Sequence, residues 1–180
     1  MNRQHRYHAP HPAIALAFVL INVLLVPWTV AAAEQPKDLY EMEVLGVVAA
    51  PGGDPSAGQA GQTAILLRGK GTKRELTLLV GPFEANSIAV PLQQMKPPRP
   101  LIHDLTLSLL AALHSRLGRV IITDFKDNTY YATLSIETDG KEITVDSRPS
   151  DAIALALRTG APIYANSKAL DGANSNRTLR

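Results

Sequence analysis

One segment near the C-terminal end constrains the fold of this 180-residue chain more than any other. Residues 145–164 read as a strand, a helix over 150–159, a stop at Gly160 and a second strand. The helix consists almost wholly of Ala, Leu and Ile, so we expect other elements to cover most of its surface. Its start is polar and carries free backbone N–H groups, which makes it the part of the unit suited to chemistry. The side chains there are Asp146, Arg148, Ser150 and Asp151.

The N-terminal segment has the pattern of a secretory signal. Basic residues without an acid precede an apolar run, and small residues close it at Ala33. We therefore predict a signal peptide over 1–33 and a secreted or periplasmic protein. The alternative is an uncleaved N-terminal helix that anchors the chain, which would be its only membrane contact. The chain has no Cys, so neither a lipidated cysteine nor a disulfide is available.

The charge of the chain depends on that signal. Of 18 Lys and Arg residues, Arg3 and Arg6 lie within 1–33, which leaves 16 basic residues against 16 acidic ones. A neutral chain has no overall field that attracts a phosphate backbone, although a local basic patch remains possible. Overall charge therefore does not argue for nucleic-acid binding. The remaining length suits one domain, which we place at 39–170, with a flexible tail over 171–180.

The pattern of apolar residues predicts an α+β fold with mixed or antiparallel sheets. Two halves each read as three strands and a helix, and an additional amphipathic helix lies between them. The predicted strands are 40–49, with a slip at Leu45 and Gly46, 63–68, 75–80, 119–125, 130–137, 141–146 and 162–165. The predicted helices are 81–95, interrupted at Pro91, 103–117, stopped by Gly118, and 150–159. From Asn166 onward the tail is polar and is expected to fray.

Four motifs in this order carry a resemblance to a known family. They are Gly-Pro-Phe-Glu-Ala over 81–85, Lys-Pro-Pro-Arg-Pro-Leu-Ile-His-Asp-Leu over 96–105, Val-Ile-Ile-Thr-Asp over 120–124, and Ser-Arg-Pro-Ser-Asp-Ala-Ile-Ala-Leu-Ala-Leu over 147–157. The chain resembles the bifunctional nuclease domain family, here as an exported bacterial member. The resemblance implies an α+β fold, a homodimer, nucleic acid as a partner, and hydrolysis of RNA or DNA by a metal-assisted water, with Mg²⁺ or Mn²⁺.

Two helix starts hold the candidate site residues. A histidine exchanges protons near neutral pH, and a carboxylate orients water or binds a metal. The candidates for catalysis are His103, Asp104 and Asp151, those for substrate binding are Arg148, Arg99, Lys96 and Ser150, and those for metal binding are Glu84 and Asp146.

Each candidate also has a structural interpretation. First-turn acids complement the helix dipole, Ser150 is a typical helix cap, and Arg148 is able to pair with Asp146, Asp151 or Glu84. Two functions therefore stay open. The first is a nuclease, and the second is a non-catalytic dimeric ligand-binding or interaction module of the cell envelope.

Overall fold

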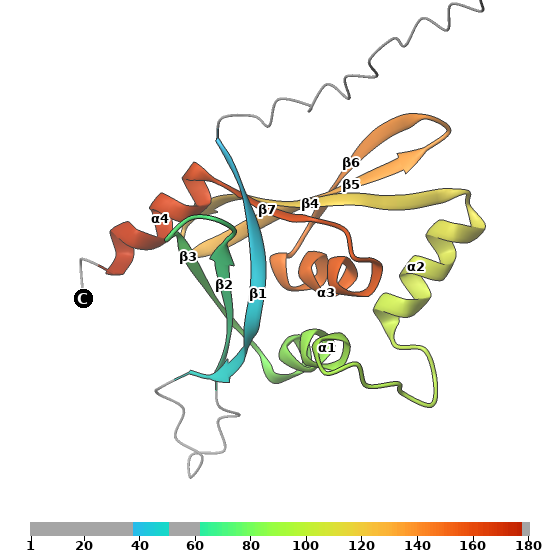
Figure 1. The fold of residues 1–180 in the computed structure, drawn as a ribbon, viewed down its shortest axis with the longest axis horizontal. Coiled ribbons are helices and arrows are strands. Elements are labelled where there is room, and N and C mark those ends of the chain that lie inside the picture. Colours follow the sequence, from blue (N-terminus) through green and yellow to red (C-terminus); the bar gives the residue numbers. More distant parts are fainter. Residues whose placement is uncertain (1–37, 51–61, 178–180) are drawn as a thin grey trace, which may run out of the picture. The chain divides into compact units, whose positions relative to one another are not determined.

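A computed structural model describes residues 38–50 and 62–177 of the chain. Seven strands form one mixed sheet in the order β3-β2-β1-β7-β4-β5-β6 (Figure 1). The strands are β1 (Leu39–Ala49), β2 (Thr63–Gly69), β3 (Glu75–Val80), β4 (Ser115–Lys126), β5 (Thr129–Thr138), β6 (Lys141–Ser147) and β7 (Ile163–Asn166). The helices are α1 (Pro82–Leu92), α2 (Ile102–Ala112), α3 (Pro149–Thr159) and α4 (Ser167–Arg177). The predicted signal peptide lies outside the described residues.

The sheet is assembled from two meanders around a central strand. β7 lies between them, antiparallel to β1 and parallel to β4. Each meander runs outward from this centre and is followed by a helix that packs under the sheet, α1 after β3 and α3 after β6. The predicted α+β class and its two β-β-β-α halves are therefore confirmed.

Of the three register shifts among the described strands of the sheet, two lie at glycines, and the third lies between Ile122 and Asp124. The register between β1 and β2 shifts between Val44 and Gly46, where the sequence predicts a slip. A second shift, between Leu117 and Arg119, brackets Gly118 in β4. A Cβ atom at Gly118 would lie 2.6 Å from the Glu137 carboxylate, so the glycine lets this side chain lie close to the β4 backbone.

The predicted helix over 103–117 is wrong in its extent and in its orientation. α2 ends at Ala112, and Leu117 is a buried residue of β4. The strand begins early because residues from Ser115 onward pair with β5. The amphipathic pattern predicts that Leu105, Leu109 and Leu113 lie on the apolar face of this helix, against the core. In the structure they face outward and are 49%, 56% and 69% exposed. His103 is buried instead, and Leu107 and Leu110 pack partly against the core.

α3 is buried along its middle, as its composition predicts. Its fully enclosed residues are Ala152, Ile153, Ala154, Leu155 and Ala156. The helix ends at Gly160, whose φ of 74° is the left-handed conformation that glycine adopts without strain. Its N-cap is Arg148, so Ser150 lies inside the first turn and is not the cap.

The chain continues into a helix where the sequence predicts a fraying tail. In α4, Ala169 and Leu170 are buried against the core. The Asn166 side chain accepts a hydrogen bond from the Ala169 N–H at 3.0 Å, which starts the helix. The sequence did not predict this helix, because Ala169 and Leu170 are too few apolar residues to give a helical pattern.

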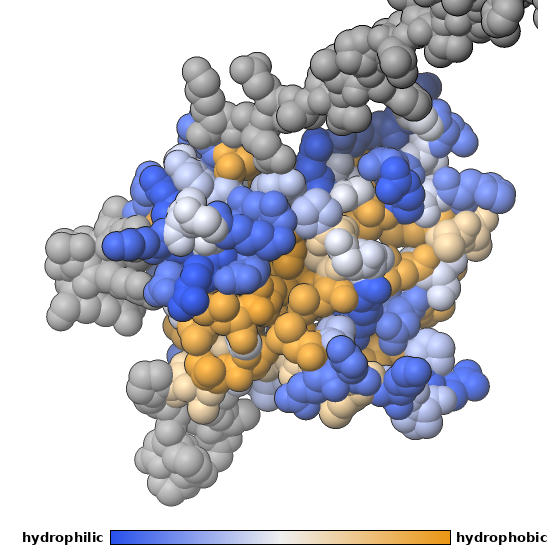
Figure 2. Space-filling model, viewed as in Figure 1, coloured by the Kyte–Doolittle hydropathy of each residue, from blue (hydrophilic) through white to orange (hydrophobic). Residues whose placement is uncertain are grey.

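Apolar side chains also reach the surface. Figure 2 shows apolar surface gathered over one face of the molecule. On β1, Leu45 and Val48 are each more than two-fifths exposed. Across residues 38–50 and 62–177, none of the helices has the length and apolar character needed to span a membrane.

Candidate functional site

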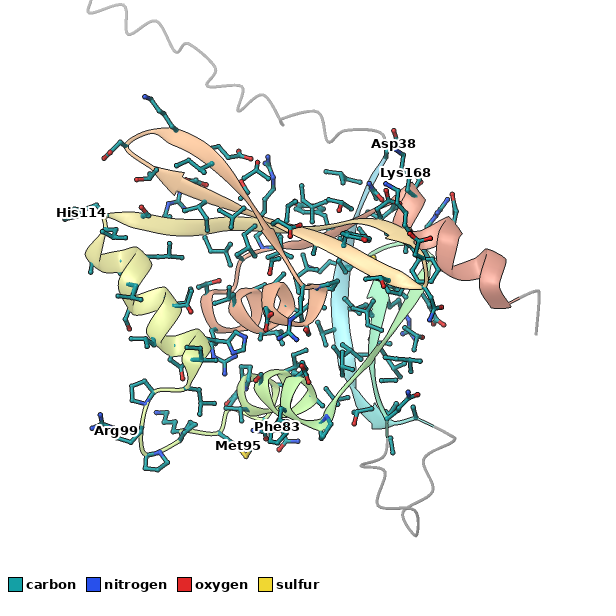
Figure 3. The ribbon with its side chains drawn as sticks, turned by 180° about the vertical axis from the view of Figure 1, so that it is seen from behind. Asp38, Phe83, Met95, Arg99, His114 and Lys168 are labelled. Atoms are coloured by element: carbon teal, nitrogen blue, oxygen red, sulfur yellow. The ribbon has the colours of Figure 1, made fainter. Side chains whose placement is uncertain are left out.

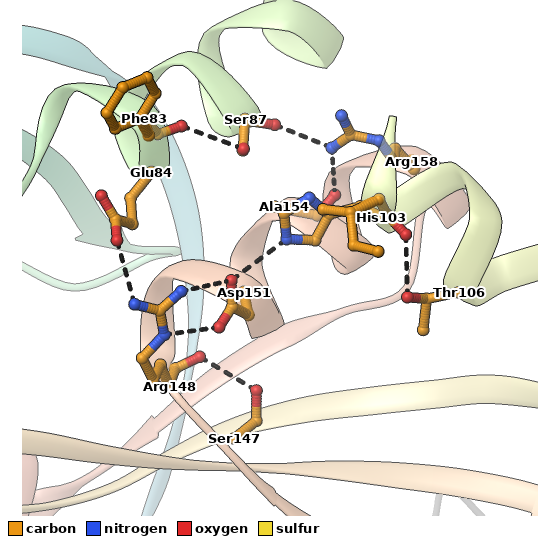
Figure 4. A network of polar contacts seen from close by, with 11 residues as sticks. Phe83, Glu84, Ser87, His103, Thr106, Ser147, Arg148, Asp151, Ala154 and Arg158 are labelled. Carbon is orange, nitrogen blue, oxygen red and sulfur yellow. Dashed lines mark hydrogen bonds and ion pairs between the residues drawn. The ribbon is translucent and has the colours of Figure 1, made fainter. Parts of the chain in front are cut away.

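The starts of α1 and α3 meet at the Arg148 guanidinium (Figure 4). Arg148 donates from Nε to Asp151 Oδ2 at 2.7 Å and from Nη2 to Asp151 Oδ1 at 3.2 Å. Its Nη1 donates to Glu84 Oε1 at 3.0 Å, across 64 positions of sequence. The predicted internal salt bridge of Arg148 is therefore present, with Asp151 and Glu84 as its partners.

His103 joins this network from the start of α2. Its Nε2 lies 3.2 Å from Asp151 Oδ1, and its side chain is only 9% exposed. Its Nδ1 is buried and has no hydrogen-bond partner among the described residues. The imidazole therefore contacts Asp151 but does not present a nitrogen to solvent.

Arg158 forms a second, more deeply buried centre. Its side chain is 7% exposed, and its Nε donates to Asp104 Oδ1 at 2.8 Å. The other oxygen of Asp104, Oδ2, accepts the Leu101 N–H at 2.8 Å, so the carboxylate also satisfies the start of α2. Asp104 is therefore held on both oxygens.

A proline in α1 leaves a backbone carbonyl free to accept a hydrogen bond from Arg158. Pro91 has no N–H, so the carbonyl of Ser87, four residues earlier, loses its helical hydrogen bond. Arg158 Nη1 donates to this carbonyl at 2.8 Å and also to the Ala154 carbonyl at 2.8 Å (Figure 4). The helix ends one residue later, at Leu92, three residues before the predicted end at 95, so the interruption predicted at Pro91 is an early end. Pro91 and Arg158 thus connect α1 to α3.

A groove opens beside the Arg148 network. It has a volume of about 650 Å³ and lies between β3, the β4–β5 hairpin and the starts of α1 and α3. Glu84, Arg148 and Ser150 line it at the helix starts, and Phe125 and Tyr130 line it on the hairpin. Arg148 is 64% exposed at its side chain, whereas Glu84 is 27% exposed.

The pKa values of Asp104 and Asp151 are both lowered, which favours their charged forms. Burial raises the pKa of Asp104, but the Leu101 N–H and the Arg158 guanidinium outweigh it, so the pKa lies below the ordinary 3.8. Burial likewise raises the pKa of Asp151, and the bonds from Arg148 and His103 more than offset it. The hydrogen bonds that Arg148 donates to Asp151 in turn raise the pKa of Arg148.

These shifts predict a loss of stability in acid. Because both native pKa values lie below 3.8, the stabilisation is complete above that pH and is lost as pH falls through the native pKa values. We expect urea unfolding to show a steep loss of stability below about pH 4. Asp104→Asn should make that loss shallower, whereas Asp139→Asn at an exposed turn is the matched control. Equal acid sensitivity in wild type and Asp104→Asn would contradict this interpretation.

The remaining predicted site residues lie apart from the network. Lys96 and Arg99 are exposed on the connector before α2, and Figure 3 shows Arg99 directed away from the helices. Asp146 is exposed on β6 opposite Thr133, and no hydrogen bond or ion pair in the described ranges joins it to Glu84. The structure therefore unites His103, Asp151, Arg148 and Glu84, with Ser150 in the adjoining groove wall.

Sequence reasoning missed Arg158. It follows Asp151 by seven positions, or two helical turns, so both point from one face of α3. That face meets the adjacent pair His103 and Asp104 on α2. The available signal was a single Arg that follows the apolar middle of this helix, but its partner Asp104 lies 54 positions away in sequence.

Glu84, Asp151 and His103 are the groups of this network that could donate to a divalent metal. Within the described ranges, no group of three or more His, Asp or Glu residues converges as metal ligands. Glu84 and Asp151 already accept hydrogen bonds from Arg148. The arrangement therefore does not fit a metal held by protein ligands alone, and the pair Glu84 and Asp146 stays a prediction.

These features define an α+β domain with an arginine–carboxylate network at a groove. Residues 65–177, more than half of the chain, match the family model described as Bifunctional nuclease domain. The chain belongs to this family, which confirms the resemblance seen in its motifs.

Relatives extend from bacteria to plants. A Mycobacterium tuberculosis protein described as uncharacterized is 45% identical over 103 residues, which cover 57% of this chain and 61% of that protein. Bifunctional nuclease 1 of Oryza sativa subsp. indica is 32% identical over 78 residues, 42% of this chain and 24% of the plant protein. Bifunctional nuclease of Oryza minuta matches to the same extent. The chain thus covers less than two thirds of each of these relatives.

Proposed function

We propose that this protein is a nuclease that hydrolyses phosphodiester bonds of RNA or DNA beside Arg148. Membership of the family and the names of the plant relatives support the activity. The observation that carries the location is the exposed Arg148 guanidinium at the groove. Three of its N–H groups are engaged by Asp151 and Glu84. In the described part of the chain, one N–H on each terminal nitrogen is left for a phosphate oxygen.

Glu84 is the general base of this proposal. Its Oε1 is held by Arg148, which leaves Oε2 to accept a proton from water. Gly81 leaves space at this oxygen, since a Cβ there would lie 2.7 Å from Oε2. The water oxygen bonds to phosphorus, the bond from phosphorus to the leaving sugar oxygen breaks, and that oxygen takes a proton from solvent. Arg148 offsets the charge that develops on the phosphate oxygens.

His103 and Asp151 are positioning residues in this scheme. Asp151 holds two N–H groups of Arg148, and His103 contacts the same carboxylate from a buried position. Together they fix the direction in which the guanidinium points. No step is assigned to a metal, because the donor set does not fit one.

The activity is tested on single-stranded and double-stranded RNA and DNA. The purified protein is incubated with each substrate in Mg²⁺, in Mn²⁺ and in EDTA, and products are resolved on a denaturing gel. We expect cleavage of at least one substrate class, and the EDTA arm decides whether the predicted metal is needed. Failure to cut any substrate in any arm would overturn the nuclease and favour the non-catalytic envelope module.

We further propose that α2 mediates a homodimer. Its outward side chains Ile102, Leu105, Leu109 and Leu113 are 49–69% exposed. The face carries no charge, because the acid of this helix, Asp104, is turned to Arg158. An uncharged leucine stripe is self-complementary about a two-fold axis.

Sedimentation velocity tests the dimer. Leu109→Glu should convert a dimer to a monomer, since two carboxylates would face each other across the axis. Val48→Glu, at a similarly exposed apolar position on β1, is the control and should stay dimeric. A wild-type monomer at all concentrations, or dissociation by both variants, would contradict this assignment.

Export is proposed from residues 1–33 of the sequence. N-terminal sequencing of the protein recovered from its host should begin at Glu34. An intact N-terminus in the membrane fraction would instead support the anchored alternative.

A further inference from the structure

The groove beside Arg148 has a second wall that the nuclease proposal does not use. The wall is formed by the β4–β5 hairpin, where the rings of Phe125 and Tyr130 lie 4.4 Å apart between centroids and are tilted by 46°. α4 supports this pair from behind, since a Cβ at Gly172 would lie 3.0 Å from Phe125. The aromatic wall is therefore held in place by packing.

The facing wall is apolar and comes from the edge strand β3. Leu79 lines the groove and is 62% exposed, and Val80 follows it. A flat, weakly polar ring fits between an aliphatic wall and an aromatic one, because both contacts bury apolar surface. The polar groups of the hairpin, at Asn128 and Thr129, also line the groove at its edge.

We infer that this groove binds one unpaired nucleotide of a single-stranded RNA or DNA, with its base against Tyr130 and its phosphate on Arg148. The inference rests on the proposed function and names its substrate class. A volume of about 650 Å³ is that of a small-ligand site and not of a duplex channel. In a duplex the faces of the bases are covered by their neighbours, so a base would enter only after leaving the stack.

The charge of the groove predicts how binding depends on salt concentration. Arg148 is its one basic lining residue within the described ranges, and Glu84 lines it as well. Affinity therefore comes from stacking and not from neutralising many phosphates. The slope of log K against log salt should correspond to about one phosphate contact, roughly −0.7 for a single strand.

Fluorescence anisotropy with labelled eight-nucleotide RNA and DNA strands tests the inference. Measurements are made at 4 °C, and a gel confirms that each strand stays intact. Tyr130→Ala should raise Kd at least about fivefold, because stacking on an aromatic ring is lost. Tyr130→Phe keeps the ring and should bind within about twofold of wild type. Tyr131→Ala is the matched control, since the adjacent residue points to the opposite face of β5.

The results separate the inference from the nuclease proposal. Equal affinity for duplex, or equal damage from Tyr131→Ala, would overturn the single-strand site. Cleavage by wild type together with unchanged binding and cleavage by Tyr130→Ala would overturn this inference and leave the nuclease standing. Weaker binding by Tyr130→Ala without cleavage by wild type would support the groove and refute the nuclease.

Discussion

Arg158→Met is expected to lower the free energy of unfolding by about 3 kcal/mol. The substitution removes the cation that faces Asp104 and leaves the Ser87 carbonyl without its donor. We place the effect at the lower end for a broken buried pair, because the Asp104 side chain is 36% exposed and gains some hydration. A loss of this size is a large share of the stability of a small domain.

Urea unfolding of wild type and variants measures this effect. Arg148→Met is the matched control, since its side chain is 64% exposed and its ion pairs should contribute under about 1 kcal/mol. Adding Asp104→Asn to Arg158→Met should recover part of the loss, because the unpaired charge is removed and Asn still accepts the Leu101 N–H. Equal losses from Arg158→Met and Arg148→Met would refute the buried centre.

Glu84→Gln is expected to reduce kcat by about 10²- to 10⁴-fold, the contribution of a general base. The amide keeps the shape of the side chain and an oxygen that accepts from Arg148, but it does not take a proton from water. Because substrate contacts stay in place, KM should change much less than kcat. Steady-state cleavage of a labelled strand measures both constants.

Gly81→Ala provides an independent test of the same atom. The added Cβ would lie 2.7 Å from Glu84 Oε2, where the proposal places the water. The backbone at Gly81 has φ −73° and ψ 168°, a conformation that alanine adopts without strain. Cleavage should fall while the melting temperature stays close to that of wild type. Full activity in both Glu84→Gln and Gly81→Ala would remove Glu84 from the mechanism.

The strands and α3 were predictable because their signals are local. Alternation marks each half-buried strand, and the slip at Leu45 and Gly46 was visible as a break in that alternation. A helix between two strands whose middle turns are wholly apolar, as in α3, has few environments other than the core. The family motifs then identified the region that becomes the network.

Other features depend on contacts between distant segments. In α2, leucines occupy two stripes, and the local pattern does not tell which stripe meets the core; the structure buries His103 and exposes Leu109. Arg158 pairs with Asp104, 54 positions away on α2. It also donates to the Ser87 carbonyl, which lies on α1 and has no helical partner because of Pro91. These pairings are set by how α1, α2 and α3 pack, which no spacing within one segment records.

Cleavage and thermal melting measured on the same preparation of Arg148→Ala test the central claim most directly. The account predicts a loss of cleavage of about 10²-fold or more, since a charge-stabilising contact is removed. It also predicts a melting temperature within a few degrees of wild type, because the side chain is 64% exposed. Unchanged cleavage together with a large fall in melting temperature would show that the Arg148 network serves only to hold the helices together.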